Sequence, residues 1–511
     1  GSYENKLIVS VVSNPYTPKA VMTEGWSFNE KLKALETSTN KIERFKKSAT
    51  APTASMNAVN IEDEDSDYEI KLWLDPTDKT AYYCAEPEKV YLNMNSSEMF
   101  YSKYGEQEIK NILEIDLSSF DTSKVTNMGR MFSGMSNLTA LDLSNFDTSK
   151  VTNMLSMFGN LRSMTDFKIS DKFKTHNVIN MASMFSNCIL LEELDLSNFD
   201  TRKVISTSAM FSGMSKVKKI ILSPNFQTSN VTNMTGMFNG CALLEKLDLS
   251  TFDTRKVTEF SYMFNACATL QKLDVSMFDT RSAVNMLSMF SGMLALSDFN
   301  LGHNFNTSNV ITMQNMFFND RKLTRLDLSQ FDTSKVTQMS NMFGYMFELE
   351  ELNLSSFDTS NVTSMASMFQ YVGKIQNLDL SSFNTSRVNS MSLMFYSANS
   401  LTNLTFGPHF DTSNVTDMEM MFFNVNGATE LDLSTFNTSN VKKLSGIFGS
   451  TTEQNNLQRI YVSHDFDVSK VPNNGFARIF SNRKNLRGGA GSYLTNPDTA
   501  NKTWLRIDRP G

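Results

Sequence analysis

The fold of this chain is decided by the stretch Phe120-Asp121-Thr122-Ser123-Lys124-Val125-Thr126-Asn127-Met128-Gly129-Arg130-Met131-Phe132, because close copies of it recur along most of the sequence. The copies follow each other in steps of 26 or 27 residues, except for a last step of 30. A fixed period of this length is typical of a solenoid, in which each coil buries its apolar side chains only against its neighbours. The fourteen copies begin at Phe120, Phe146, Phe173, Phe199, Phe226, Phe252, Phe278, Phe305, Phe331, Phe357, Phe383, Phe410, Phe436 and Phe466.

Each coil is predicted to contain one short strand and one short helical segment. The pattern Leu-x-x-Leu-Asp-Leu-Ser precedes each Phe, as in residues 138–144, and its apolar–polar alternation has the period of a strand. After the Phe, Val125, Met128, Met131 and Phe132 fall at helical spacing, and Asp-Thr-Ser offers oxygens that cap a helix. We therefore predict an α/β repeat solenoid with one parallel strand plus a short helical segment per 26–27-residue coil, its strands stacking into one long sheet.

The sequence outside the repeats indicates a leader and two caps. Residues 1–65 carry no repeat and are predicted to be helical or loosely ordered. Residues 66–110 contain two predicted strands, at 69–74 and 81–84, and form the expected N-terminal cap. The solenoid is assigned to residues 111–480. The glycine-rich, atypical residues 481–511 are assigned to a C-terminal cap, because an open coil end would expose apolar side chains.

Composition restricts the classes of partner. A net charge of −7 and a pI near 5.4 argue against nucleic acid, which requires a basic surface. No run of eighteen apolar residues is present, so membrane insertion is not predicted. Most of the 33 Met and 39 Phe recur in fixed repeat columns and are interpreted as core. Cys188, Cys241 and Cys267 share a column with Met residues, which predicts free buried thiols and no metal site or cofactor.

The exposed face of the predicted sheet is the natural binding surface. A central column carries Asp in eight coils, and the column beside it varies in charge. The Asp column is either an acidic stripe for cations or basic ligands, or a set of side chains that bond the Ser of the neighbouring coil. The variable column is either a specificity surface or an ordinary solvated face. The candidate ligand-binding residues are Asp195, Lys219, Lys246, Asp248, Lys272, Asp274, Arg325 and Asp327; no catalytic residue is predicted.

A nearly unbroken Thr column, which starts at Thr122 and Thr148, permits two interpretations. A flat Thr array at strand spacing is what an ice-binding solenoid would present. Each Thr also stands just before the predicted helical segment, where capping explains it with no further assumption. We expect capping.

The phrase Leu-Asp-Leu-Ser-Asn-Phe-Asp-Thr-Ser-Lys-Val-Thr-Asn-Met-x-x-Met-Phe at residues 141–158 closely resembles the 26-residue repeat of BspA-like leucine-rich-repeat surface proteins of bacteria and mycoplasmas. The resemblance spans residues 110–480. It implies a leucine-rich-repeat-like, right-handed superhelix and an extracellular or cell-surface location. It also implies roles in adhesion or host contact, and it supplies no catalytic residues.

Three functions follow as hypotheses. The leading one is a non-enzymatic adhesin or ligand-binding module for a host or matrix protein or glycan, because the repeat columns are uniform and no coil carries a catalytic constellation. One alternative is a carbohydrate-active enzyme on a parallel β-solenoid, which requires unusual polar residues clustered in adjacent coils. The other is a passive spacer that projects another domain.

Overall fold

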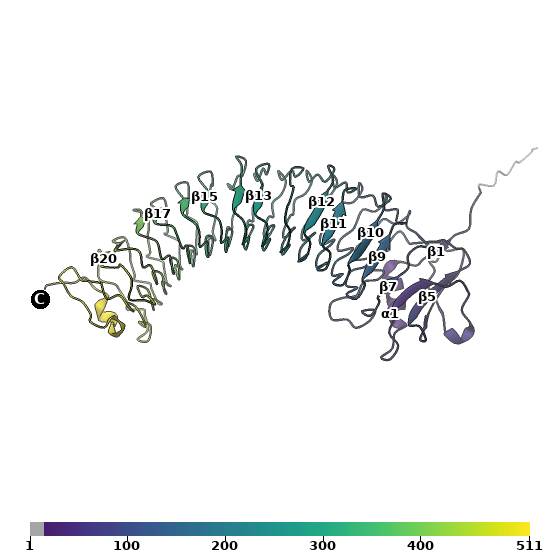
Figure 1. Cartoon of the computed structure of the whole chain (residues 1–511), viewed down its shortest axis with the longest axis horizontal. Coiled ribbons are helices and arrows are strands. Elements are labelled where there is room, and N and C mark those ends of the chain that lie inside the picture. Colours follow the sequence, from purple (N-terminus) through teal and green to yellow (C-terminus); the bar gives the residue numbers. More distant parts are fainter. Residues whose placement is uncertain (1–14, 511) are drawn as a thin grey trace, which may run out of the picture. The chain divides into compact units, whose positions relative to one another are not determined.

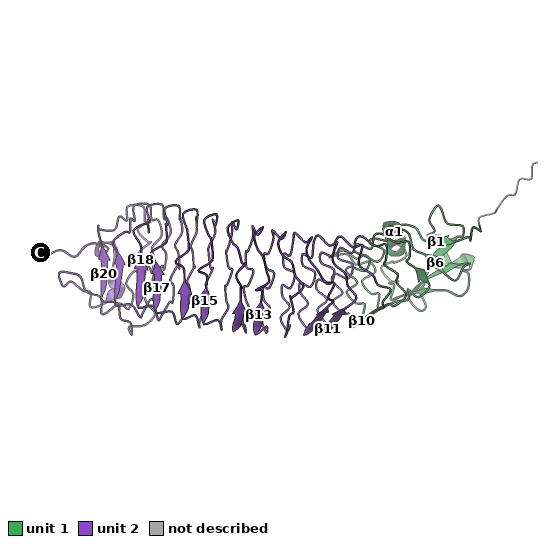
Figure 2. Ribbon diagram, turned by 90° about the horizontal axis from the view of Figure 1, so that it is seen from above, with its two compact units in different colours: residues 1–151, 166–173 green, residues 152–165, 174–511 purple. Residues whose placement is uncertain are grey.

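The computed structural model describes residues 15–510 and divides into two compact units (Figure 2). Unit 1 comprises residues 1–151 and 166–173, and unit 2 comprises residues 152–165 and 174–511. The division falls inside the repeats and differs from the boundaries predicted at residues 65, 110 and 480, which stay predictions.

Unit 1 combines three sheets with one α-helix, and residues 140–143 and 166–169 form the third sheet as a parallel pair. Its elements are β1 (Ala20–Val21), α1 (Gly25–Ala34), β2 (Arg44–Lys47), the 3₁₀ helix η1 (Ala54–Met56), β3 (Val59–Asn60), β4 (Ile70–Asp75), β5 (Thr80–Ala85), β6 (Val90–Tyr91), β7 (Glu114–Ile115), β8 (Phe120–Asp121), β9 (Ala140–Leu143) and β10 (Asp166–Ile169). One sheet has the order β3-β4-β5-β2-β7, and β1, β6 and β8 form a second, parallel sheet. The predicted strands at 69–74 and 81–84 correspond to β4 and β5. Phe28 of α1 packs edge-on against Phe45 of β2, so residues before 65 contribute to the core of this unit.

Unit 2 is a stack of repeat coils with short strands on the same side of successive coils (Figure 1). Its elements are β11 (Glu193–Leu196), β12 (Lys219–Leu222), β13 (Lys272–Asp274), β14 (Asp298–Asn300), β15 (Arg325–Asp327), β16 (Glu351–Asn353), β17 (Asn377–Leu380), β18 (Asn403–Phe406), β19 (Glu430–Leu433), β20 (Arg459–Val462) and the 3₁₀ helices η2 (Pro497–Thr499) and η3 (Lys502–Trp504).

The strands confirm the predicted alternation but not one continuous sheet. In β11, Leu194 and Leu196 are buried while Glu193 and Asp195 are exposed. The strands pair in parallel two by two, as β11 with β12, β13 with β14, β15 with β16, β17 with β18 and β19 with β20. Residues 245–249, which the structure describes, form no strand although the same pattern precedes Phe252. The long strand sheet expected from the pattern is therefore wrong.

The predicted helical segment in each coil is also wrong. Between residues 111 and 480, all of them described, the segment after the Phe forms consecutive turns rather than helix. The Met157 amide donates to the Met154 carbonyl three residues back, whereas the Ser156 and Phe158 amides donate to the next coil. A helix requires amides to bond within their own segment, and positive φ values at Ser156 and Asn160 interrupt it further. Apolar residues three apart therefore mark successive turns here.

These turns carry the continuous ladder of the solenoid. Isolated parallel bridges join one residue of each coil to its equivalent in the next, without interruption from Asn153 to Lys443. Alternate amides on either side of the bridge donate to the following coil, as Phe238 does to Met263 and Phe264 to Met289, both at 2.9 Å. The backbone pairing that runs without interruption through these coils of unit 2 is thus in the turns and not, as predicted, in the strands.

The core consists of stacked columns of identical side chains. Phe264, Phe290 and Phe317 stack with ring centroids 5.7 to 5.8 Å apart, and the Met residues one position earlier are fully buried. Cys188, Cys241 and Cys267 are free and buried, and burial raises the pKa of the Cys188 and Cys267 thiols to about 12. These observations confirm the interpretation of the Met, Phe and Cys columns as core.

The Thr column joins neighbouring coils and does not cap helices. The Thr228 hydroxyl donates to the Asp253 carbonyl at 2.7 Å and accepts from the Asp253 amide at 2.8 Å. Thr307 and Thr333 make the same pair of bonds to Asp332 and Asp358. All of these Thr side chains are buried, so they cannot present an ice-binding array.

Asp320 interrupts the apolar column that contains Cys241, Cys267 and Met346. It is fully buried, and its Oδ2 has no hydrogen-bond partner. Its Oδ1 accepts from the Met293 amide at 3.0 Å, whereas the equivalent amides of other coils donate to a Phe carbonyl three residues back, as Cys241 does to Phe238. Burial raises the pKa of Asp320 well above its usual range and so favours the neutral acid, which can donate as well as accept.

We expect the Thr228→Val variant to lose about 1–3 kcal/mol of stability, because the amide and carbonyl of Asp253 lose the buried hydroxyl that both of them bond. Thr232→Val is the control, since Thr232 is exposed in the same coil. Urea unfolding followed by circular dichroism measures both. Equal midpoints for the two variants would show that the buried hydroxyls do not hold the coils together.

We expect Asp320→Asn to become increasingly stabilising relative to the wild type as pH rises. Because the folded pKa of Asp320 is raised, its contribution to stability is complete below the unfolded pKa of about 4 and is lost as pH rises through the folded pKa. Asn keeps an acceptor and a donor at every pH. Thermal melts between pH 5 and 9 test this, with the exposed Asp327→Asn as control, and parallel profiles for wild type and Asp320→Asn would contradict it.

Candidate functional site

The predicted ligand-binding residues all lie exposed on the strand face of unit 2. Six of them are on strands, and two are in the coil around residues 245–249 that forms no strand. A binding role for them stays a prediction. They are Asp195 on β11, Lys219 on β12, Lys272 and Asp274 on β13, Arg325 and Asp327 on β15, and Lys246 and Asp248 between β12 and β13.

The Asp column shapes the turn that follows each strand. Asp248 Oδ1 accepts from the Ser250 amide at 2.9 Å, and Asp274 and Asp327 bond Ser276 and Ser329 in the same way. These hydrogen bonds favour the carboxylate and hold the pKa of Asp248, Asp274 and Asp327 below its usual range. The Ser that each Asp bonds belongs to the same coil. The second of the two interpretations of the Asp column, in which Asp bonds the Ser of the neighbouring coil, is therefore wrong in this detail.

The variable column is organised by strand pairing. In five of the six two-stranded sheets of residues 15–510, an acidic residue on one strand stands opposite a basic residue on the other, an arrangement that favours pairing, whereas β17 and β18 carry no such pair. Arg325 and Glu351 are register partners and form an exposed ion pair at 3.7 Å. The other opposed charges are Asp142 and Lys168, Glu193 and Lys219, Lys272 and Asp298, and Glu430 and Arg459.

Two grooves lie on the strand face, and both are lined by Arg325 and Asp327. The larger, about 890 Å³, extends from β15 over β16 to β17 and is also lined by Glu350, Glu351 and Lys374. The smaller, about 370 Å³, lies between β14 and β15 and includes His303. Most of the polar atoms in these walls belong to charged or amide side chains, which can hydrogen-bond peptide or sugar groups.

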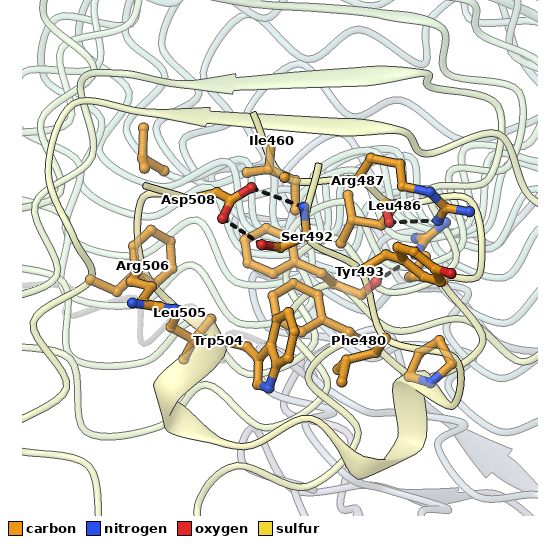
Figure 3. A pocket seen from close by; sticks show the side chains of 17 residues that line it. Ile460, Phe480, Leu486, Arg487, Ser492, Tyr493, Trp504, Leu505, Arg506 and Asp508 are labelled. Atoms are coloured by element: carbon orange, nitrogen blue, oxygen red, sulfur yellow. Dashed lines mark hydrogen bonds between the residues drawn. The ribbon is translucent and has the colours of Figure 1, made fainter. Parts of the chain in front are cut away.

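A separate cavity of about 130 Å³ lies in the C-terminal part of unit 2 (Figure 3). Its apolar walls include Phe480 and Trp504. The Asp508 carboxylate closes one side by accepting from the Ala490 and Ser492 amides at 2.8 and 3.1 Å. The guanidinium of Arg487 stacks on the Tyr493 ring, 4.4 Å from its centroid.

A buried cation adjoins this cavity. Arg483 is only 2 % exposed and lines the cavity. Its guanidinium donates to backbone carbonyls, among them Phe448 and Gly449, and to the side-chain oxygen of Asn426. Burial lowers its pKa to about 9. Among residues 15–510, no carboxylate lies within ion-pair distance of Arg483, so its charge is held by dipoles alone.

Reasoning from the repeats did not find the cavity or the lining of the grooves. The cavity residues lie in residues 448–508, where the repeat decays, so no column comparison reaches most of them. Two features of the sequence could have indicated the cavity. Arg483 stands in a column that is apolar in most other coils, and Trp504 is a tryptophan outside the repeats. Glu350 and Lys374 fall beside the two columns that were compared, so the grooves were missed as well.

Within residues 15–510, no cluster of three or more His, Cys, Asp or Glu side chains is arranged to hold a metal ion. No helix of that part of the chain combines the length and apolar character needed to cross a membrane.

The fold and these surfaces define the class of protein, a β-solenoid repeat protein with coils of about 26 residues and almost no helix. The chain belongs to the family described as "Mycoplasma protein of unknown function, DUF285", which matches residues 94–224, 215–325, 295–407 and 406–504. This membership confirms the predicted resemblance to a repeat class that includes mycoplasma proteins. No curated protein matches the chain.

Two solved structures illustrate the similarity to bacterial leucine-rich-repeat proteins. A leucine-rich cell-surface protein from Faecalibacterium prausnitzii is 14% identical, with a TM-score of 0.28, over 66% of this chain and 97% of that one. A leucine-rich-repeat protein from Eubacterium ventriosum is 14% identical, with a TM-score of 0.29, over 62% of this chain and 78% of that one.

We expect charge pairing between β15 and β16 to be measurable as a coupling. Arg325→Glu and Glu351→Arg should each lower the urea midpoint slightly, and the double swap should restore it, with a coupling of about 0.2–1 kcal/mol. Urea unfolding of the four proteins in a double-mutant cycle measures this. Strictly additive effects would show that the opposed charges do not contribute to strand pairing.

Proposed function

We propose that this protein is a non-enzymatic, cell-surface or secreted repeat protein whose strand face binds a host or matrix protein or a glycan. The observation that carries the proposal is the pair of grooves on either side of β15, both lined by the exposed Arg325 and Asp327. Repeat proteins commonly place recognition on variable exposed positions of a uniform scaffold. The extracellular location rests on the resemblance of the repeat.

The scaffold is suited to this role because its framework and its surface use different residues. Stacked Phe and Met side chains and the Thr hydroxyls are buried and repeat in nearly every coil. The groove walls instead vary from coil to coil, as Arg325, Glu351 and Asn377 do at equivalent positions of β15, β16 and β17. Groove side chains can therefore change without disturbing the core.

A carbohydrate-active enzyme is the second candidate, favoured by three carboxylates, Asp327, Glu350 and Glu351, in the larger groove. Glycosidases use a pair of carboxyl groups, one of them a general acid with a raised pKa. The pKa of Asp327 is lowered by the Ser329 amide, which suits a turn and not an acid catalyst. Release of reducing sugars from neutral or acidic polysaccharides by the purified protein would favour the enzyme.

Deletion of whole coils separates a binder from a spacer. We expect the purified protein to bind members of a glycan and matrix-protein array, and removal of residues 305–356, which include β15 and β16, to abolish that binding. Removal of the coil at residues 410–435 is the control, because that coil lines neither groove and contains no candidate ligand-binding residue, and it should leave the groove ligand bound. Binding that survives both deletions would indicate a spacer that carries its ligand site elsewhere.

The surface location is tested on intact cells of the source organism. We expect an antibody against unit 2 to label unpermeabilised cells or to detect the protein in the medium, and external protease to remove the cell-bound signal. Labelling that requires permeabilisation would overturn the proposed location.

A further inference from the structure

The cavity in the C-terminal part of unit 2 combines an apolar interior with an excess of positive charge. Aromatic side chains of Phe480, Tyr493 and Trp504 contribute to its walls. Figure 3 shows Trp504 in the lower part of the view, between the labels of Leu505 and Phe480. Three arginines line it, against a single carboxylate, that of Asp508. A cavity of this composition is suited to a ligand with an apolar body and a negative group.

The protein balances the charges of the cavity only in part. Arg506 lies near Asp465 and Asp508 and helps to lower the pKa of both carboxyls, whereas Arg483 has no carboxylate partner within residues 15–510. Asp508 is occupied by the Ala490 amide and by the amide and hydroxyl of Ser492. Arg483 is buried and donates only to carbonyl and amide oxygens. A buried cation without an anionic partner is costly, and an anion bound beside it removes part of that cost.

The size of the cavity limits the ligand. At about 130 Å³ it is comparable with an engineered apolar cavity of about 150 Å³ that accepts benzene. A single aromatic ring therefore fits, with a short chain that reaches toward the arginines. Arg487 stacks on Tyr493 and donates to the Lys484 and Leu486 carbonyls. Arg506 is exposed at the cavity, so its guanidinium is the one best placed to meet the ligand's carboxylate.

We propose that this cavity binds a small aromatic carboxylate, with the ring among Trp504, Tyr493 and Phe480 and the carboxylate near the arginines. The site is distinct from the strand-face grooves, with which it shares no lining residue. The ligand contact combines burial of the ring with a charge-assisted hydrogen bond.

The test compares 3-phenylpropionate with its neutral isostere 3-phenylpropanamide on the full chain. We expect the carboxylate to give saturation transfer by NMR and to change tryptophan emission, and the amide to bind about tenfold more weakly, since it lacks the charge-assisted bond. Trp504→Phe should abolish the emission change but keep the saturation transfer, because the remaining tryptophans, Trp26 and Trp73, lie in unit 1.

Two matched variants localise the charge effect. Arg506→Gln should weaken carboxylate binding about two- to fivefold, the range of an exposed ion pair. Arg478→Gln removes the same charge from an exposed position that does not line the cavity, and it should leave the affinity unchanged. The proposal is overturned if acid and amide bind equally, if the two variants weaken binding equally, or if millimolar carboxylate produces no saturation transfer.

Discussion

The structure of unit 2 depends on hydrogen bonds that run from one coil to the next. In the segment after each Phe, the amides do not all find carbonyl partners within the segment, as they would in a helix. Alternate amides therefore donate to carbonyls of the following coil. The buried Thr hydroxyl adds a second connection that both donates to and accepts from the same residue of the next coil, as Thr228 does with Asp253. Neither connection exists in an isolated coil, which explains why the coil must repeat.

This constraint separates the roles of the columns. Positions that face the interior or join coils are nearly invariant, because a change at one of them leaves a polar group or a cavity in two coils at once. Asp320 and Arg483 depart from this pattern, and each is accommodated by new hydrogen bonds to backbone groups. Positions of the variable column on the strand face carry no such restriction, and there Lys, Arg, Glu and Asn replace one another.

Much of the solenoid could be predicted from the sequence, because period and alternation report burial directly. The repeat length, the inward Leu residues and the buried Met, Phe and Cys columns follow from it. The segment predicted to be helical could not be recognised as a series of turns, because a helix and such turns both place apolar residues three apart, as Val125, Met128 and Met131 are. The pairing of strands could not be predicted from one coil, because it is a property of two coils, and opposed charges do not decide it: β17 and β18 pair with Asn377 opposite Asn403. The exposed candidate residues were placed correctly on one face. The grooves that Arg325 and Asp327 line could not be predicted, because each is formed by residues of two or more coils, which no single column reveals.

The unequal pairing on the two sides of the coils has a mechanical consequence. The bridge ladder is unbroken from Asn153 to Lys443, whereas the strands opposite it are joined only in twos. When unit 2 is bent or stretched, we therefore expect neighbouring strand pairs to separate at their junctions, while the hydrogen-bonded bridge ladder keeps the spacing of the coils on its own side. The smaller groove lies at such a junction, between β14 and β15, and the larger groove includes the one between β16 and β17, so the width of both is expected to vary with load on the molecule.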